Sequence, residues 1–431
     1  MKFIRRIKNK IIPVVRPSLI YDDALSAAYQ TAPIAWEYTN GLKLLLVHDG
    51  GSLSKTLIER FSLDNIEVTE INVLDETTEI PINADALLIA FEWTPEPEML
   101  RLKSISNETY NAFLAKYTEA PLQIVRKVLD ANNNIKILTL LPSFAFTEKY
   151  GFTVYGIAAN HLVAMLEQQC GYLVRMQYVN IQYAKTLKAQ TDAKANIISK
   201  DGSLGHILLR EQVAAVVTML LGEQGGAIKS NIIKIGVVDS TNMEYPIVNR
   251  RIDGIKRGSV CAGALADKNI MMLYNDEKAF LSIKDRLEYE SSFIGGRFIE
   301  DDINEQQLLQ LKREYVGNID IVVNVIKPAS NGTPITQLYR WLQRESPFLT
   351  QQNWQAVICN ILLMKRESIT VYEAEIKSFT SSLARLLGNH GFVVNSVVVD
   401  ECIDKNNMPE VVAFLSSKYG EALTGETIIM K

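Results

Sequence analysis

Short apolar runs of strand length alternate with helical patterns along almost the whole chain, and this alternation most constrains how the chain can fold. Apolar strands that are separated by helices predict a parallel sheet covered by helices on both faces. Crossover connections of this kind are right-handed almost without exception, which gives a doubly wound sheet. The sequence therefore predicts an α/β protein.

The alternation occurs once in the first half of the chain. The strands predicted there are 42–47, 66–73, 84–91, 135–141, 174–181 and 231–238, and the predicted helices are 53–61, 106–131, 154–169 and 210–221. After about residue 240 the sequence turns irregular and polar, which is typical of a linker.

The same order then starts again. Strands are predicted at 269–274, 292–298, 319–325, 392–399 and 426–430, and helices at 279–287, 305–315, 334–344, 350–364, 372–387 and 409–417. A length of 431 residues suits two domains, each able to bury its own core. We therefore divide the chain into an N-terminal extension (1–40), a first domain (41–240), a linker (241–266) and a second domain (267–431).

Composition excludes several classes of function. The net charge of −4 gives no sign of nucleic-acid binding, and no apolar run reaches the roughly 18–20 residues that span a bilayer. The four cysteines have no CxxC pairing and the four histidines are scattered, which argues against a metal site and a disulfide framework. We expect a cytoplasmic protein without a bound metal.

The N-terminus differs from the rest of the chain. Residues 2–16 hold six basic side chains and no acidic one, with apolar residues at roughly helical spacing before Pro13. One interpretation is a flexible basic tail. The other is a short amphipathic helix that docks on an acidic partner or makes peripheral contact with an anionic membrane surface.

Three stretches of the second half resemble short-chain dehydrogenases/reductases. They are Asp320–Asn324 (DIVVN), Ser381–Arg385 followed by 391–397 (GFVVNSV), and Pro409–Ser417 followed by 423–428 (LTGETI). The first half repeats the last of these more weakly, at 210–221 and 232–235. The whole layout is similar to the high-molecular-weight 3-oxoacyl-[acyl-carrier-protein] reductases. This resemblance implies two tandem Rossmann-type domains.

Carbonyl reduction in that family requires a glycine-rich turn for the cofactor pyrophosphate. Residues 274–280, where this turn would lie in the second half, contain no glycine, and Asp276 and Glu277 would repel phosphates. The first half keeps Gly50 and Gly51, although a glycine pair after a strand is commonly just a turn. Together with Asp302, which the resemblance places near adenine, these two glycines are the only cofactor-binding candidates.

The family also needs a Tyr that donates a proton, a Lys four residues later, and a Ser and an Asn. In the first half Tyr155 occupies the Tyr position and Ser143 lies twelve residues before it, but Ala159 replaces the Lys. Tyr155 and Ser143 are therefore weak catalytic candidates, and we interpret Tyr155 as a packing residue.

The second half is further from the family pattern. There Ile369 and Glu373 fall at the Tyr and Lys positions, and Asn324 matches an Asn of the family. Residues 354–360 resemble the helix that carries another Asn of the family, and the stretch between them and the last long helix has no room for the strand that carries the Ser.

We therefore expect a catalytically degenerate, ketoreductase-like protein without a cofactor, which serves fatty-acid or polyketide-type synthesis as a structural or regulatory subunit. The resemblance implies assembly through 372–387 and 409–430 with itself, an active ketoreductase or another synthase component, and docking of an acyl carrier protein on the basic N-terminus. One alternative is an NADPH-dependent 3-oxoacyl thioester reductase that uses Tyr155. Another is a small-molecule sensor or membrane-surface protein.

Overall fold

The computed structural model describes much of residues 41–430. The gaps are 75–82, 94–104, 133, 147–152, 171–176, 184–185, 188–207, 230–231, 237–264, 266–267, 289–292, 299–318, 329–332, 341–355, 389–391, 402–406 and 418–419. The N-terminal extension, Asp302, the predicted helix 305–315 and all of the predicted linker except Leu265 lie outside the described residues.

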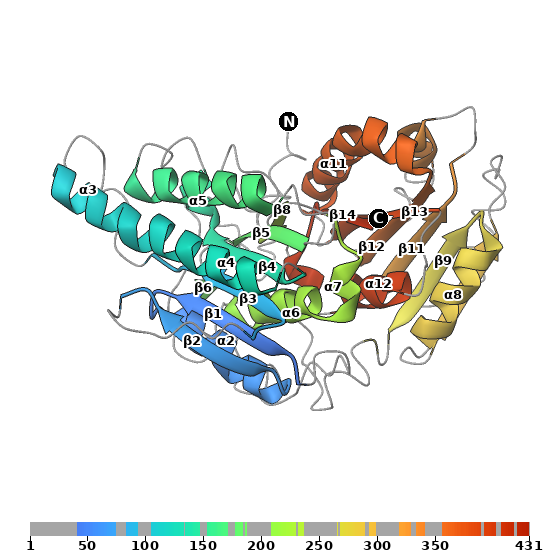
Figure 1. Ribbon diagram of the computed structural model, residues 1–431. Coiled ribbons are helices and arrows are strands. Elements are labelled where there is room, and N and C mark those ends of the chain that lie inside the picture. The colour runs from blue at the N-terminus through green and yellow to red at the C-terminus, as the bar shows by residue number, and fades with distance from the viewer. Residues whose placement is uncertain are drawn as a thin grey trace, which may run out of the picture.

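The first half forms a six-stranded parallel sheet (Figure 1). In spatial order its strands are β2 (Glu67–Asn72), β1 (Lys43–His48), β3 (Ala86–Ala90), β4 (Lys136–Pro142), β5 (Gln177–Tyr183) and β8 (Ile232–Ile235). A short pair, β6 (Thr186–Leu187) and β7 (Leu208–Leu209), lies apart from this sheet. The six strands are those predicted from the apolar runs, with ends that differ by a few residues.

The second half repeats this order in a second six-stranded parallel sheet. Its strands are β10 (Phe293–Phe298), β9 (Asn269–Tyr274), β11 (Ile321–Ile326), β12 (Val357–Met364), β13 (Val393–Asp400) and β14 (Thr427–Met430). In both sheets the direction of winding reverses after the second strand of the half, so the reversal of strand order lies between β1 and β3 and between β9 and β11. The described residues thus form two doubly wound, Rossmann-like α/β units, as the sequence predicts.

Helices cover both faces of the first sheet. One face carries α2 (Ser52–Leu63) and α6 (Arg210–Leu221), and the other carries α5 (Val154–Cys170) and the helix 107–131. The alternating side chains of the strands divide accordingly: Leu44 and Leu46 of β1 pack on the α2 side, while Leu45 and Val47 pack on the α5 side.

The predicted helix 106–131 is continuous but locally widened. It consists of α3 (Asn107–Leu114), a π-helical turn (Ala115–Glu119) and α4 (Ala120–Ala131). Pro121 lies in the first turn of α4. Because proline lacks an N–H and its ring clashes with the carbonyl four residues earlier, regular α-helix cannot continue through it. The widened turn accommodates that break.

The second sheet is covered in the same way. Helices α8 (Glu277–Glu288) and α12 (Met408–Ser416) lie on one face, and α11 (Arg366–Gly388) lies on the other with the helical residues 334–340. Short elements complete the described part of the fold: 3₁₀ turns at Ser143–Phe146 and Gly420–Ala422, and a single helical turn, α7 (Glu223–Gly226).

One predicted helix is wrong. Residues 357–364 of the expected helix 350–364 form the fully buried strand β12, and α11 begins at Arg366 rather than near residue 372. A continuous apolar run such as Val357–Met364 has no periodicity that separates a central strand from a buried helix. The strand that the sequence interpretation found no room for is therefore present.

The two sheets meet edge to edge, at a seam formed by the edge strands β8 and β14 (Figure 1). The N–H of Lys229 donates to the carbonyl of Ile429 at 2.7 Å, and that of Gly236 donates to Ala422 at 2.9 Å. Beside this seam α7 approaches α12, α6 approaches the 3₁₀ turn Gly420–Ala422, and one hydrophobic cluster runs without a break through both halves. The segment 409–430, expected to bind a partner, is thus largely buried inside the chain itself.

Candidate functional site

The first candidate site lies at the carboxyl ends of β1 and β3, the two strands between which the strand order of the sheet reverses. In doubly wound sheets ligands bind at this reversal of strand order. The turn from β1 to α2 contains Gly50, whose φ of +73° is unfavourable for other residues, and Gly51, the N-cap of α2. The free N–H groups and the dipole of a helix N-terminus attract an anion, and in cofactor-binding relatives of this fold the anion is a phosphate.

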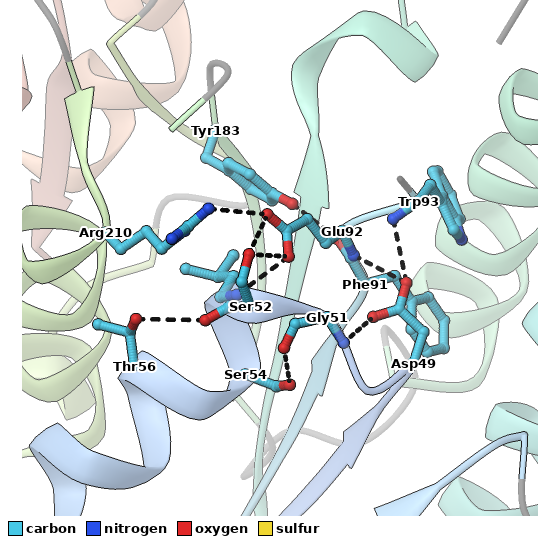
Figure 2. A network of polar contacts seen from close by, with 11 residues as sticks. Asp49, Gly51, Ser52, Ser54, Thr56, Phe91, Glu92, Trp93, Tyr183 and Arg210 are labelled. Carbon is cyan, nitrogen blue, oxygen red and sulfur yellow. Dashed lines mark hydrogen bonds and ion pairs between the residues drawn. The ribbon is translucent and has the colours of Figure 1, made fainter. Parts of the chain in front are cut away.

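In this chain the anion at the N-terminus of α2 is a side chain of the protein, Glu92 (Figure 2). One of its carboxylate oxygens accepts the backbone N–H of Leu53 at 3.0 Å, and the hydroxyl of Ser52 lies 3.0 and 3.1 Å from the two oxygens. Arg210, the first residue of α6, adds an ion pair at 3.6 Å, and the Glu92 and Arg210 side chains are only 15% and 11% exposed. A buried carboxylate therefore satisfies donors that a phosphate would use.

Gly51 is required by this carboxylate. A Cβ atom on Gly51 would lie 2.5 Å from a carboxylate oxygen of Glu92 and 2.9 Å from its Cβ. The backbone of Gly51 is ordinary, with φ −64° and ψ 170°. The small size of Gly51, rather than its flexibility, thus allows Glu92 to approach α2.

Asp49 holds Glu92 in place. One oxygen of its carboxylate accepts the N–H groups of Glu92 and Trp93, both at 3.0 Å, and the other accepts the N–H of Gly51 at 3.3 Å. Burial raises the pKa of Asp49 despite these hydrogen bonds. Trp93 adopts φ +47°, an uncommon conformation for a non-glycine residue. Asp49 thus ties the end of β3 to the turn after β1.

Tyr155 opens α5 at the same end of the sheet and packs in an aromatic cluster. Its ring lies 5.2 Å from that of Trp93 and 5.0 Å from that of Phe113, and Phe91 and Tyr117 complete the group. Tyr155 is 1% exposed, and burial, with smaller contributions from Tyr117 and Asp49, raises its pKa above the ordinary value of 10. A tyrosine in this state is a poor proton donor at neutral pH.

The remaining residues of that catalytic pattern pack in the core. Ser143 is buried at the start of the 3₁₀ turn after β4, and Ala159 is a buried residue of α5. The structure therefore brings Gly50, Gly51 and Tyr155 to one end of one sheet, without a cation at the Lys position.

In the second half, polar contacts join the segments that follow β9 and β11 at the equivalent position. Asn275 and Lys327 form a reciprocal pair, in which the side chain of Asn275 donates to the Lys327 carbonyl at 3.0 Å and accepts its N–H at 2.7 Å. Asp276 accepts the N–H of Ala279 at 2.9 Å and thereby caps α8. The ammonium group of Lys327 lies 3.9 Å from Asp276 and 3.8 Å from Glu401.

The catalytic positions inferred for the second half have other roles. Ile369 is buried in the core beneath α11, and Glu373 forms an ion pair at 2.6 Å with Lys377 along the same helix. Asn324 lies inside the sheet, where its amide donates to Asn360 at 2.9 Å. The strand β12 ends in Leu362, Leu363 and Met364, so it has no hydroxyl group at its carboxyl end.

No sequence motif predicts a site role for Asp49, Glu92 or Arg210. Asp49 directly follows β1, and Glu92 follows β3 after one intervening residue. The carboxyl ends of neighbouring parallel strands lie at the same edge of a sheet. The position of Asp49 and Glu92 after neighbouring strands could therefore have been used to predict that they lie close together. The pairing of Glu92 with Arg210 could not be predicted, because these residues are far apart in the sequence.

The described residues contain no cluster of histidine, cysteine and acidic side chains that could hold a metal ion, and none of their helices has the length and apolar character to cross a bilayer. A scan against protein-family models gives no match, and a search of curated proteins gives none either.

Proposed function

We propose that this protein is a catalytically degenerate, ketoreductase-like chain that acts by association, as a structural or regulatory subunit in fatty-acid or polyketide-type synthesis. The observation that carries the proposal is the carboxylate of Glu92 on the N-terminus of α2. That carboxylate, with Arg210 beside it, takes the place of the cofactor pyrophosphate in the first half.

A dinucleotide would have to displace Glu92 from its donors before it could bind in this orientation. Its pyrophosphate would also approach Asp49, whose carboxylate lies against the same turn. Burying phosphate charge beside carboxylates is unfavourable. In the second half Asp276 already caps α8, and Asn275 and Lys327 join the two strand ends across the crevice.

Proton donation is opposed as well. The family chemistry uses a cation to lower the pKa of the Tyr, but Ala159 stands at that position. Burial instead raises the pKa of Tyr155. The three positions that the family chemistry uses, namely the phosphate turn, the acid and the cation, are thus occupied by residues with a packing or capping role.

The surface that supports association is the outer face of α11. Val371 and Leu386, near the two ends of this helix, are 72% and 67% exposed. The other segment implied by the resemblance, 409–430, lies along the seam between the sheets and is used within the chain. We therefore propose that a synthase partner contacts α11.

Cofactor binding gives the first test. Wild-type protein is titrated with NADPH by fluorescence and assayed with an acetoacetyl thioester, and we expect neither binding at millimolar cofactor nor turnover. In Glu92→Ala, inorganic pyrophosphate should bind roughly tenfold more tightly than in wild type, because the α2 donors and Arg210 become free. Adding Arg210→Ala should remove the gain. Turnover by the wild type would replace the proposal with the NADPH-dependent reductase.

Association gives the second test. Wild type and the double variant Val371→Glu, Leu386→Glu are used as bait in a native lysate, with Leu281→Glu as a matched control. Leu281 is a 46% exposed leucine on α8, which covers the opposite face of the second sheet. We expect the α11 variant alone to lose a ketoreductase or acyl-chain-handling partner. Recovery of the wild type as a lone monomer would contradict the proposal.

A further inference from the structure

Two buried amides in the second sheet leave one acceptor and one donor without a partner. The side chain of Asn324 on β11 donates to the side-chain oxygen of Asn360 on β12 at 2.9 Å, and the two residues are Cα partners in the ladder. Both residues are fully buried. Among the described residues, the oxygen of Asn324 and the amide nitrogen of Asn360 have no hydrogen-bond partner. An unpaired buried polar atom is unfavourable, so two of them at one place point to a small bound molecule.

The amides belong to a row of polar side chains that leads across the sheet to α11. Side chains of a strand alternate between its two faces, and the residues two positions before and after Asn360, Ile358 and Leu362, pack in the cluster beneath α11. The next Cα partner in the row is Ser396 on β13, whose hydroxyl lies 2.7 Å from that of Thr380 on α11. These two hydroxyl groups have two protons and share one hydrogen bond, so one of them can still donate.

The first half places a phenol in the equivalent row. Strands β4 and β5 pair in the same register as β12 and β13, so that Thr139 stands where the second half has Asn360. The hydroxyl of Tyr178 on β5 lies 3.2 Å from that of Thr139. The residue of β13 equivalent to Tyr178 is Val394, which is shorter and has no polar atom in its side chain. The second half therefore lacks the hydroxyl group that this position supplies in the first half.

We propose that one water molecule is bound between Asn324 and Asn360, in the place that a phenol hydroxyl occupies in the first half. It donates to the free oxygen of Asn324, accepts an N–H of Asn360 and bonds to the hydroxyl pair that joins β13 to α11. Buried water molecules typically make about three hydrogen bonds, to groups that the protein leaves unpaired. The water thus continues the polar row from β11 to α11 and holds this helix in position on the sheet. The inference is independent of the proposed function, since it concerns the interior of the second half.

Water fits this site better than an ion or a rearranged pair of amides. The strands β11 and β12 contain no charged residue, so they offer nothing to balance the charge of a bound ion. Rotating one amide by half a turn would set oxygen against oxygen or nitrogen against nitrogen, and would break the hydrogen bond that the two share. Rotating both leaves one oxygen and one nitrogen free again. The pair therefore requires a neutral molecule that both donates and accepts.

Crystallography of the full chain tests the site directly. At a resolution that shows ordered water, we expect one density peak at about 2.7–3.2 Å from both the free oxygen of Asn324 and the amide nitrogen of Asn360. Asn395 is the matched control, because it is a fully buried asparagine of β13 whose amide bonds to Leu423 and Glu426 at 2.7 and 3.1 Å. No water should lie against Asn395. A site between Asn324 and Asn360 that holds no water would overturn the proposal.

Variants that remove the site test it in solution. Oxygen-17 relaxation dispersion of the water signal counts long-lived internal water molecules, and the double variant Asn324→Leu, Asn360→Leu should hold one fewer than wild type. Val394→Tyr keeps both amides but supplies a phenol as in the first half, and it should lose the same water. Asn160→Leu makes the same chemical change at an exposed position of α5 and should keep the wild-type count. Circular dichroism checks that each variant is folded; a folded double variant with the wild-type count would refute the bound water.

Discussion

Glu92 and Gly51 show how one residue determines the chemistry of a turn. Glu92 lies 39 residues after the N–H of Leu53 that it accepts, and it fills space that only a glycine at position 51 leaves open. Gly51 is thus explained by an internal carboxylate, and Gly50 by its positive φ. A phosphate would have imposed the same requirement on the backbone, so the glycines alone cannot distinguish the two.

A double-mutant cycle measures this contact. Because the backbone of Gly51 suits any residue, Gly51→Ala should be destabilising chiefly through its collision with Glu92, with a smaller contribution from Asp49, by about 1–3 kcal/mol in all. In a Glu92→Ala background the penalty should fall by at least ~1 kcal/mol. Urea denaturation of the four proteins measures the coupling, and effects that add within ~0.5 kcal/mol would show that the two residues act independently.

At the scale of elements, Lys136 joins a strand to a helix. It opens β4, and its ammonium group donates to the carbonyls of Leu220, Leu221 and Gly222 at 2.8, 3.0 and 2.9 Å. These carbonyls lie at the C-terminal end of α6, where helix carbonyls run out of intrahelical partners. Lys136 therefore caps α6 and orients the helix that carries Arg210 at its other end.

Removing this cap should lower the free energy of unfolding and change its dependence on pH. Lys136→Met is expected to lose about 1–3 kcal/mol of the free energy of unfolding. Burial and Lys229 lower the pKa of Lys136 to about 8, so the unfolded chain binds more protons between pH 8 and 10.5. Wild-type stability should gain a rising contribution across that window that Lys136→Met lacks.

Chemical denaturation at a series of pH values makes this comparison. Lys43→Met is the matched control, because Lys43 opens β1 of the same sheet but is exposed. A stability curve for Lys136→Met that parallels wild type above pH 8 would contradict the assigned titration.

For the whole molecule, the cluster shared by both halves predicts that the two Rossmann-like units unfold together. Phe414 of α12 is fully buried in this cluster, beside the seam. Phe414→Ala should lower the free energy of unfolding by about 3–5 kcal/mol, and strands of the first half should be destabilised along with those of the second.

Denaturant-dependent hydrogen exchange of β1 and β12 reports on the two halves separately. Both strands should lose protection in parallel in Phe414→Ala. Val371→Ala, on the exposed face of α11, should change the free energy of opening of either strand by less than about 0.5 kcal/mol. Loss of protection confined to the second half would show that the halves are independent.

Individual elements show what could be predicted. Strand β1 was predicted almost to the residue because its apolar run is short and a glycine turn follows it, and helix α6 because its apolar stretch is too long for a strand. Strand β12 was taken for a helix, because a run that is buried on both faces carries no period. The positions of Gly50, Gly51 and Tyr155 at one site followed from the resemblance, whereas the occupant of that site did not.

Local sequence patterns predict the two doubly wound sheets, because the burial of each strand and helix is visible in its own residues. The contact of Glu92 with α2, the capping of α6 by Lys136 and the meeting of β8 with β14 follow only from the tertiary fold. Each of these contacts joins residues distant in the chain, and their proximity depends on packing that no local pattern encodes.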